Sequence, residues 1–285
     1  MGTSTAMFRK ILKDVLSKVH PVDVSSLYTE VPRSAGKIPN HVYQTWISPV
    51  LPFLHARGLK RFRRLNPDFS FSFFDDQRMA RYMESHYAGH PILKVFKDVR
   101  MPAEKADIWR YCLLYREGGV YCDIKSAIAV PLRNLIQCDC SELISFQRNT
   151  WQNFLDPGRF ADPDLYLSAP PDSVRSNLEH PDKVVINWLL CFEKGNPILE
   201  ELINLIVRHS RFYRDKAFEH VDLAGNHFTG PLALTQAVWQ WMQKTGKRPT
   251  QCGIDFRGQG RWRIRGMDYS KSPHHSSMRN LSLLA

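Results

Sequence analysis

Residues 102–125 read PAEKADIWRYCLLYREGGVYCDIK, and this stretch decides the fold of the chain. Pro102 suits the first position of a helix, where its missing N–H needs no partner, and no further Gly or Pro occurs before Gly118. Gly118 and Gly119 end the helix and allow a sharp reversal of the chain. Apolar and polar residues then alternate as far as Lys125, which is the pattern of a half-buried strand. The stretch therefore predicts a helix, a glycine break and a strand.

Four charged residues of this stretch form a candidate site. Asp107 and Arg110 lie three residues apart, so in a helix they share one face and can act together. Asp123 and Lys125 lie two residues apart, so in a strand their side chains point the same way. In an α/β sheet, ligands bind outside the carboxyl ends of the strands. We expect this carboxylate and this ammonium at such an end.

The segments on either side alternate between strand and helix patterns, which predicts a mixed, mainly parallel α/β sheet flanked by helices in a single domain. The expected strands are 38–46, 69–73, 126–130 and a segment within 140–148, and the expected helices are 54–66, 77–86, 198–210 and 232–245. Asp75 and Asp76 are expected to cap helix 77–86. Residues 149–183 are rich in Pro and Asp, and a loop of this length is usually functional or mobile. We interpret it as an acceptor-side insertion or lid.

The composition is that of one globular domain with an ample core, because 43% of the 285 residues are hydrophobic and 24% are charged. The net charge of +11 favours anionic partners such as nucleotide phosphates, acidic glycans, anionic membranes or nucleic acid. Six cysteines without metal-like spacing indicate reduced thiols in a reducing compartment. The sequence has neither a run of about 18 apolar residues nor a signal-peptide pattern. A cytoplasmic location is expected, with peripheral membrane attachment as an alternative.

The pattern divides the chain into three regions. Residues 1–37 hold an amphipathic helix at 7–19 and a linker, residues 38–250 the α/β domain, and residues 251–285 a basic tail. The helix at 7–19 carries an apolar stripe bordered by basic residues. Two interpretations of it are open: it packs on the domain, which we favour, or it contacts a membrane surface.

The stretch KADIWRYCLLYREGGVYCDIK resembles the signature of the DXD-motif sugar-binding glycosyltransferases, which include fungal initiating α-mannosyltransferases and capsular and viral transferases. The family pattern, D-x-x-R-Y-x-x-L-y-x-x-G-G-i-Y-x-D-x-D, is matched without a gap from Asp107 to Asp123. A weaker resemblance extends from Ile38 to Pro231. It implies a GT-A-type fold. It also implies an enzyme that moves a hexose from a nucleotide-diphosphate sugar to a glycan or other acceptor, with retention of configuration.

The resemblance implies a role for each residue of the candidate site. Asp107 and Arg110 would hold hydroxyls of the donor sugar, because a carboxylate and a guanidinium suit polyols. Asp123 would bind the ribose or the sugar, and Lys125 would lie near the diphosphate. The weaker matches add donor-binding residues, one of them a tryptophan that can stack on the base: Gln44, Thr45, Trp46, Asn187 and Gly230.

Two positions depart from the family pattern. Lys125 stands in place of the second aspartate, which in the family binds a divalent cation, and Tyr43 stands in place of a histidine. A manganese or magnesium ion is implied, with Asp123, His274 and His275 as candidate ligands. We expect reduced dependence on it, because a protonated lysine cannot ligate a metal and repels a cation nearby. The donor is expected to be UDP- or GDP-linked, while nucleoside, acceptor and oligomeric state stay open.

Two other classes of function are weighed against a transferase. A catalytically degenerate protein that only binds a nucleotide or glycan would explain Lys125 and Tyr43. A basic nucleic-acid-binding protein would explain the net charge, the arginines at 57–64 and those at 257–265. No named nucleic-acid-binding motif occurs, so no nucleic-acid partner is expected.

Overall fold

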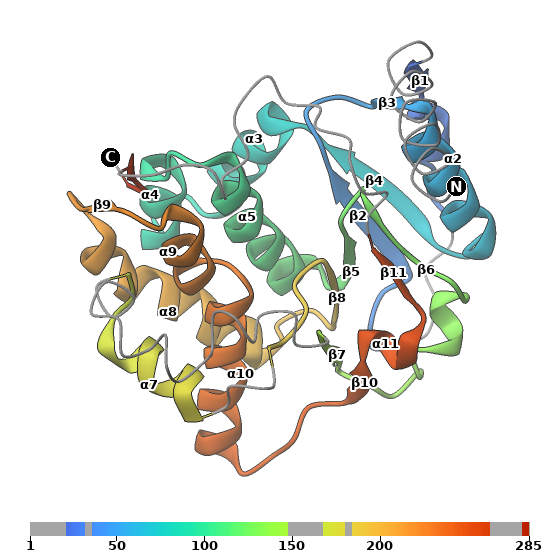
Figure 1. Cartoon of the computed structure of the whole chain (residues 1–285). Coiled ribbons are helices and arrows are strands. Elements are labelled where there is room, and N and C mark those ends of the chain that lie inside the picture. Colours follow the sequence, from blue (N-terminus) through green and yellow to red (C-terminus); the bar gives the residue numbers. More distant parts are fainter. Residues whose placement is uncertain (1–20, 32–35, 148–167, 180–183, 263–280, 285) are drawn as a thin grey trace, which may run out of the picture.

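The computed structural model describes residues 21–31, 36–147, 168–179, 184–262 and 281–284 (Figure 1). At its centre lies a six-stranded sheet with the order β10-β7-β8-β5-β2-β4. Neighbouring strands are parallel except where β8 pairs antiparallel with β5 and β7. The mixed, mainly parallel α/β sheet flanked by helices is confirmed. Its strands are β2 (His41–Thr45), β4 (Ser70–Phe74), β5 (Gly119–Cys122), β7 (Glu142–Phe146), β8 (Leu189–Phe192) and β10 (Gln251–Ile254).

The order in which strands are added to the sheet reverses at β2, because the strands that follow it lie on its two opposite sides. From β2 the chain passes through α2 (Phe53–Leu65) to β4 on one side. It then passes through three helices to β5 on the other side: α3 (Asp76–His86), α4 (Pro91–Asp98) and α5 (Pro102–Glu117). Open α/β sheets bind ligands outside the carboxyl ends of the strands at such a switch point. The topology therefore points to the ends of β2 and β5.

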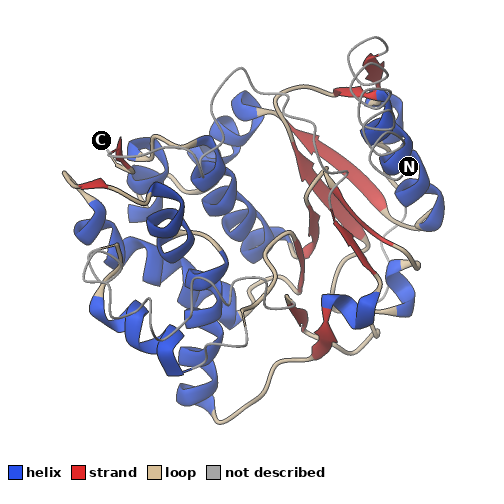
Figure 2. Cartoon of the chain, viewed as in Figure 1, coloured by secondary structure: helices blue, strands red, loops and turns tan. Residues whose placement is uncertain are grey.

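The two faces of the sheet are covered by different helices (Figure 2). On one face, Tyr43 and Tyr121 belong to the large core that α3, α4 and α5 form with three later helices. On the other face, Val42 and Val120 pack with Phe62 of α2. This alternation follows from the period of two in a strand. The later helices are α8 (Pro197–Tyr213), α9 (Val221–Phe228) and α10 (Pro231–Thr245).

Three small two-stranded ribbons lie around the sheet. They pair β1 (Pro21–Asp23) with β3 (Val50–Pro52), β6 (Ser126–Ile128) with β11 (Gly260–Trp262), and β9 (Ala217–Phe218) with β12 (Leu281–Ser282). Three further elements are the short helices η1 (Ser25–Leu27), η2 (Leu132–Asn134) and α11 (Asp255–Gly258).

The two positions that end α5 require glycine for two reasons, the backbone conformation and the close packing around them. Gly118 and Gly119 have φ angles of +67° and +103°, which side chains rarely adopt. A Cβ on Gly119 would lie 2.7 Å from the carbonyl oxygen of His41, and one on Gly118 would lie 2.7 Å from the amide nitrogen of Lys194. Glycine at both positions lets β5 start immediately beside β2.

The structure differs from the sequence-based expectations in two regions. The segment expected to be a loop at 149–183 contains α7 (Pro171–Glu179), which packs on α10. Residues 149–167 and 180–183 of this segment lie among those not described. The tail expected from residue 251 begins with β10, which extends the central sheet beside β7. The helix at 7–19 lies outside the described residues. The division into three regions stays a prediction.

In the part of the chain that the structure describes, none of the helices combines the length and apolar character needed to cross a membrane.

Candidate active site

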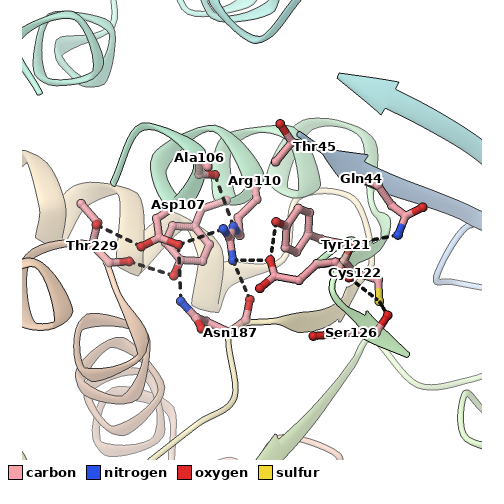
Figure 3. A network of polar contacts seen from close by, with 12 residues as sticks. Gln44, Thr45, Ala106, Asp107, Arg110, Tyr121, Cys122, Ser126, Asn187 and Thr229 are labelled. Carbon is pink, nitrogen blue, oxygen red and sulfur yellow. Dashed lines mark hydrogen bonds and ion pairs between the residues drawn. The ribbon is translucent and has the colours of Figure 1, made fainter. Parts of the chain in front are cut away.

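Arg110, on α5, lies at the centre of a network of polar contacts (Figure 3). Its Nη2 lies 3.2 Å from Oδ1 of Asp107, and its Nη1 lies 3.5 Å from Oδ1 of Asp123. Nη1 also donates to the carbonyl oxygen of Asn187 at 2.9 Å. The guanidinium lies over the ring of Tyr121, 4.1 Å from its centroid. One buried cation thus joins the end of β5, helix α5 and the segment before β8.

Asp107 is held by three donors and is 9% exposed. Besides Arg110, it accepts hydrogen bonds from Oγ1 of Thr229 at 3.2 Å and from Nδ2 of Asn187 at 3.4 Å. Burial raises the pKa of Asp107 to about 6, although the Arg110 charge opposes this shift. The group is therefore a carboxylate at neutral pH and can accept hydrogen bonds from sugar hydroxyls.

Asp123 follows the last residue of β5 and lies where the topology places a ligand. Its backbone N–H donates to the carbonyl oxygen of Trp188 at 2.8 Å, which anchors it beside β8. Its Oδ1 accepts a 2.6 Å hydrogen bond from the hydroxyl of Tyr121. The side chain is 39% exposed, so its second oxygen is available to a ligand.

Asp123 and Lys125 do not share a strand face as expected. The amide of Ser126 donates to the carbonyl oxygen of Asp123 at 2.8 Å, so residues 123–126 form a turn. This turn ends β5 at Cys122 and sends Lys125 toward β2. The ammonium of Lys125 lies 4.5 Å from the ring centroid of Trp46, a cation–π distance. The turn thus brings two predicted site residues together from different strands.

The side chains of Gln44 and Thr45 form hydrogen bonds to neighbouring strands of the sheet. Gln44 is buried, and its Nε2 donates to the carbonyl oxygen of Cys122 at 3.3 Å. Thr45 donates through Oγ1 to the carbonyl oxygen of Phe74 at 2.8 Å. Both residues tie the end of β2 to its neighbouring strands, and Gln44 holds the residue that precedes Asp123. Donor binding by Gln44 and Thr45 stays a prediction.

Asn187 and Gly230 lie close to the network as the weaker matches imply. Asn187 contacts both Asp107 and Arg110. Gly230 caps α10 directly after Thr229, and a Cβ there would lie 2.8 Å from Cα of Asn226. Tyr111 donates to the carbonyl oxygen of Thr229 at 2.8 Å and fixes this corner.

The sequence assigned no role to two residues that bind the site's carboxylates. Tyr121 donates to Asp123, and Thr229 donates to Asp107. Tyr121 could have been found, because it lies two residues before Asp123 and so shares its face of the strand. Thr229 could have been found only from the Thr-Gly-Pro motif before α10. Neither residue is charged, so neither stands out in a search for catalytic groups.

The described residues do not fit a two-carboxylate metal site. Within the described ranges, no cluster of three or more His, Cys, Asp or Glu side chains is placed to bind a metal ion. Asp123 brings one carboxylate, whose Oδ1 is already shared by Tyr121 and Arg110. His274 and His275, the other candidate ligands, lie outside the described residues.

Glu104 adds a second buried acid one helical turn before Asp107. It is 3% exposed, and no hydrogen-bond partner is present for its Oε2 among the described residues. Burial, helped by the negative charge of Asp107, raises the pKa of Glu104 to about 8. Its side chain fills the space above Gly225 on α9, where a Cβ would collide with it.

Changing Glu104 to glutamine is expected to make stability less dependent on pH. Because its pKa is about 8 in the folded chain and ordinarily 4.5, the folded state binds the proton more tightly. The stabilisation is complete below pH 4.5 and is lost as pH rises toward 8. Denaturant melts across this range should therefore show Glu104→Gln gaining stability over wild type with rising pH. The exposed Glu219→Gln is the control, and a parallel decline in all three proteins would contradict the assignment.

Comparison with protein families agrees with this geometry. Residues 52–142 match the family described as "Glycosyltransferase sugar-binding region containing DXD motif". The matched region contains the end of β5, helix α5 and Lys125. Over these residues the chain is similar to the sugar-binding region of the DXD-motif glycosyltransferases, the family that its sequence resembles.

Two curated relatives show the extent of the likeness. An initiation-specific alpha-1,6-mannosyltransferase of Candida albicans is 26% identical over 237 residues, covering 79% of this chain and 57% of the relative. Inositol phosphoceramide mannosyltransferase 3 of Schizosaccharomyces pombe is 28% identical over 237 residues, covering 81% of this chain and 52% of the relative. The chain thus spans a little over half the length of the curated relatives it matches. Among solved structures, PaToxG glycosyltransferase matches with a TM-score of 0.47 and 14% identity, over 85% of this chain and 77% of the other.

Proposed function

We propose that this chain is a GT-A-type glycosyltransferase that binds a nucleotide-diphosphate sugar at the carboxyl ends of β2 and β5. The observation that carries the proposal is the joining of Asp107 and Asp123 by the buried guanidinium of Arg110. An enzyme that handles a polyol needs fixed hydrogen-bonding groups of both signs, and this pair of acids with one cation supplies them.

The chemistry of the step gives each group a role. The bond between the anomeric carbon and the diphosphate breaks, and its electron pair leaves with the diphosphate. An acceptor hydroxyl forms the new glycosidic bond and gives its proton to the departing diphosphate. The departing diphosphate gains negative charge, so nearby cations stabilise the transition state. Lys125 is an exposed cation at this edge, and the buried Arg110 lies 3.5 Å from Asp123.

The names of the relatives suggest the sugar. Both curated relatives described above are mannosyltransferases by name, and one of the two names gives an acceptor, inositol phosphoceramide. We therefore propose mannose as the sugar, UDP or GDP as the leaving group and a glycan as the acceptor. Transfer with retention of configuration is part of the proposal, because the family resemblance implies it.

Trp46 is proposed to stack on the base of the donor. It follows the last residue of β2 and is partly exposed, and the Lys125 ammonium lies beside its ring. Trp46→Ala is expected to weaken binding of the free nucleoside diphosphate by about 1–3 kcal/mol, the usual value of base stacking on an aromatic side chain. Calorimetry should show this loss, and Trp46→Phe should recover most of it. Unchanged affinity in Trp46→Ala would mean that the ring only packs on the ribbon of β1 and β3.

Lys125 is proposed to reduce the need for a divalent cation. It brings a positive charge to the place where the family pattern has a second carboxylate, and it can pair directly with a phosphate oxygen. We expect wild-type donor hydrolysis to survive exhaustive chelation, and Lys125→Ala to lose rate whether or not manganese is present. Lys194→Ala, on the exposed loop before α8, is the control. Activity of the wild type that vanishes on chelation and returns with manganese would refute this role.

The proposed function is tested by screening nucleotide sugars against the full chain. A bound donor stabilises the folded state by mass action, so one donor should raise the melting temperature and be turned over in a hydrolysis or transfer assay. A donor that binds without release of free sugar would favour the degenerate binding protein. Salt-sensitive binding of duplex DNA or RNA, with no effect of any donor, would favour the nucleic-acid-binding protein.

A further inference from the structure

An exposed apolar segment starts immediately after the candidate site. Ile47, Val50 and Phe53 are 63%, 45% and 39% exposed, and they lie within seven consecutive residues that follow Trp46. Between them, Leu51 is buried beside α2 and holds the segment in place. Single exposed apolar residues scattered over a surface are ordinary, whereas exposed apolar residues that gather in one patch mark an interaction surface.

The outward face of α2 continues this segment with positive charge. Among the residues of the helix whose exposure is described, five are exposed and fall within an arc of about 100° around its axis: Phe53, Arg57, Lys60, Arg61 and Arg64. The opposite side of the helix, with Ala56, Leu59 and Phe62, is buried against the sheet and the β1–β3 ribbon. In Figure 1, α2 lies on the outer side of the sheet, away from α5.

The charges of this face are not neutralised by neighbouring acids. The helix itself contains no Asp or Glu. Among the described residues, no salt bridge involves Arg57, Lys60, Arg61 or Arg64, whereas the surface lysines Lys94 and Lys97 elsewhere do pair with acids. Arg63 differs from the others, because it turns inward to the carbonyl oxygen of Asn66 and the ring of Phe71. The outward face of α2 thus presents four cations and Phe53. The exposed Ile47 and Val50 come shortly before this helix in the chain.

We propose that this surface, formed by Ile47, Val50 and the outward face of α2, docks on an anionic phospholipid bilayer. Basic residues are attracted to anionic headgroups, and apolar side chains beside them enter the headgroup boundary. A nucleic-acid partner would match the charge equally well. It would leave the aliphatic side chains of Ile47 and Val50 in water, so the lipid surface fits better.

Docking on this surface would place the candidate site next to the membrane. Ile47 follows Trp46 directly in the chain, and Arg57, the first basic residue of the α2 face, follows ten residues after Ile47. The β2 end of the site would therefore lie beside the lipid headgroups, where a lipid-linked acceptor would be presented. Only this last consequence rests on the proposed function; the docking itself does not.

The test is sedimentation of the full chain with vesicles of phosphatidylcholine, with and without phosphatidylserine. Wild type should bind only the vesicles with phosphatidylserine. The double variant Arg57→Gln/Arg61→Gln should lower the partition coefficient by about tenfold or more, since each basic residue near the surface contributes appreciably. Phe53→Ser should lower it by about fivefold, and should still do so at high salt, where charge attraction is screened.

The matched control is Lys247→Gln/Arg248→Gln, which removes the same charge from an exposed loop between α10 and β10. It should bind vesicles as wild type does. All variants should hydrolyse donor at the wild-type rate when vesicles are absent, which separates this proposal from the transferase function. Three results would overturn the proposal: no preference of wild type for anionic vesicles, an equal loss in the control variant, or binding of duplex RNA without binding of vesicles.

Discussion

Arg110→Ala is expected to abolish sugar transfer and to lower the free energy of unfolding by about 3–5 kcal/mol, the usual cost of removing one partner of a buried ion pair. Asp107 would remain buried without its cation, and the carbonyl oxygen of Asn187 would lose its donor. Activity assays together with denaturant melts would measure both effects. Arg110 is only 6% exposed, so the variant leaves its partners buried. Its loss should therefore be felt in stability as well.

Two further variants separate the role in catalysis from the role in the fold. Arg110→Lys keeps the charge but loses the planar fork, so it should recover part of the stability and little of the activity. Arg116→Ala removes another arginine from α5. Its ion-pair partner, Glu117, is partly exposed, so the free energy of unfolding should change by less than about 1 kcal/mol. Near-wild-type turnover in Arg110→Ala would refute the assignment.

Gly119→Ala is expected to destabilise the chain by about 3 kcal/mol or more, because backbone strain and overpacking each cost up to about that amount. The added Cβ would lie 2.7 Å from the carbonyl oxygen of His41 and 3.1 Å from Cε2 of Tyr43. Either β2 or β5 must move, and Asp123 lies four residues further along the chain, directly after the end of β5. We therefore expect lower donor affinity as well as a lower melting temperature.

Gly58→Ala is the matched control for this substitution. Gly58 lies in α2, and no atom approaches within 4 Å of the position that a Cβ would take. Alanine there should stabilise the protein by up to about 1 kcal/mol, since glycine is the poorer helix former. If both glycine variants behaved alike, the close approach of β2 and β5 would not be the cause.

The parts of the fold with strong local signals could be predicted from the sequence. Pro102 begins α5 and Gly118 caps it, as the pattern indicates. Asp75 caps α3 by accepting a hydrogen bond from the amide of Arg78. The spacing of Asp107 and Arg110 predicted their contact, because residues three apart in a helix share a face.

The remaining features depend on contacts that are distant in sequence. The chain turns at Asp123 because Ser126 bonds back to it and because β6 pairs with β11, which lies far along the chain. α7 carries a weak helical signal but is held by Asp172, which accepts from His209 and Gln236. β10 pairs with β7 across more than a hundred residues of chain. The residue pattern within each of these segments does not indicate which distant segment it will contact.

The central claim is that the carboxyl ends of β2 and β5 form a donor site with Asp123 at its centre. The most direct measurement is turnover of GDP- and UDP-linked sugars by the wild type and by Asp123→Asn. The asparagine is nearly isosteric and the side chain is 39% exposed, so the fold should be kept. We predict that the wild type turns over one of these donors and that Asp123→Asn loses at least about a hundredfold in rate, the scale of removing one electrostatic contact to the reacting group. Equal rates in the two proteins, or no turnover of any such donor by the wild type, would contradict the account.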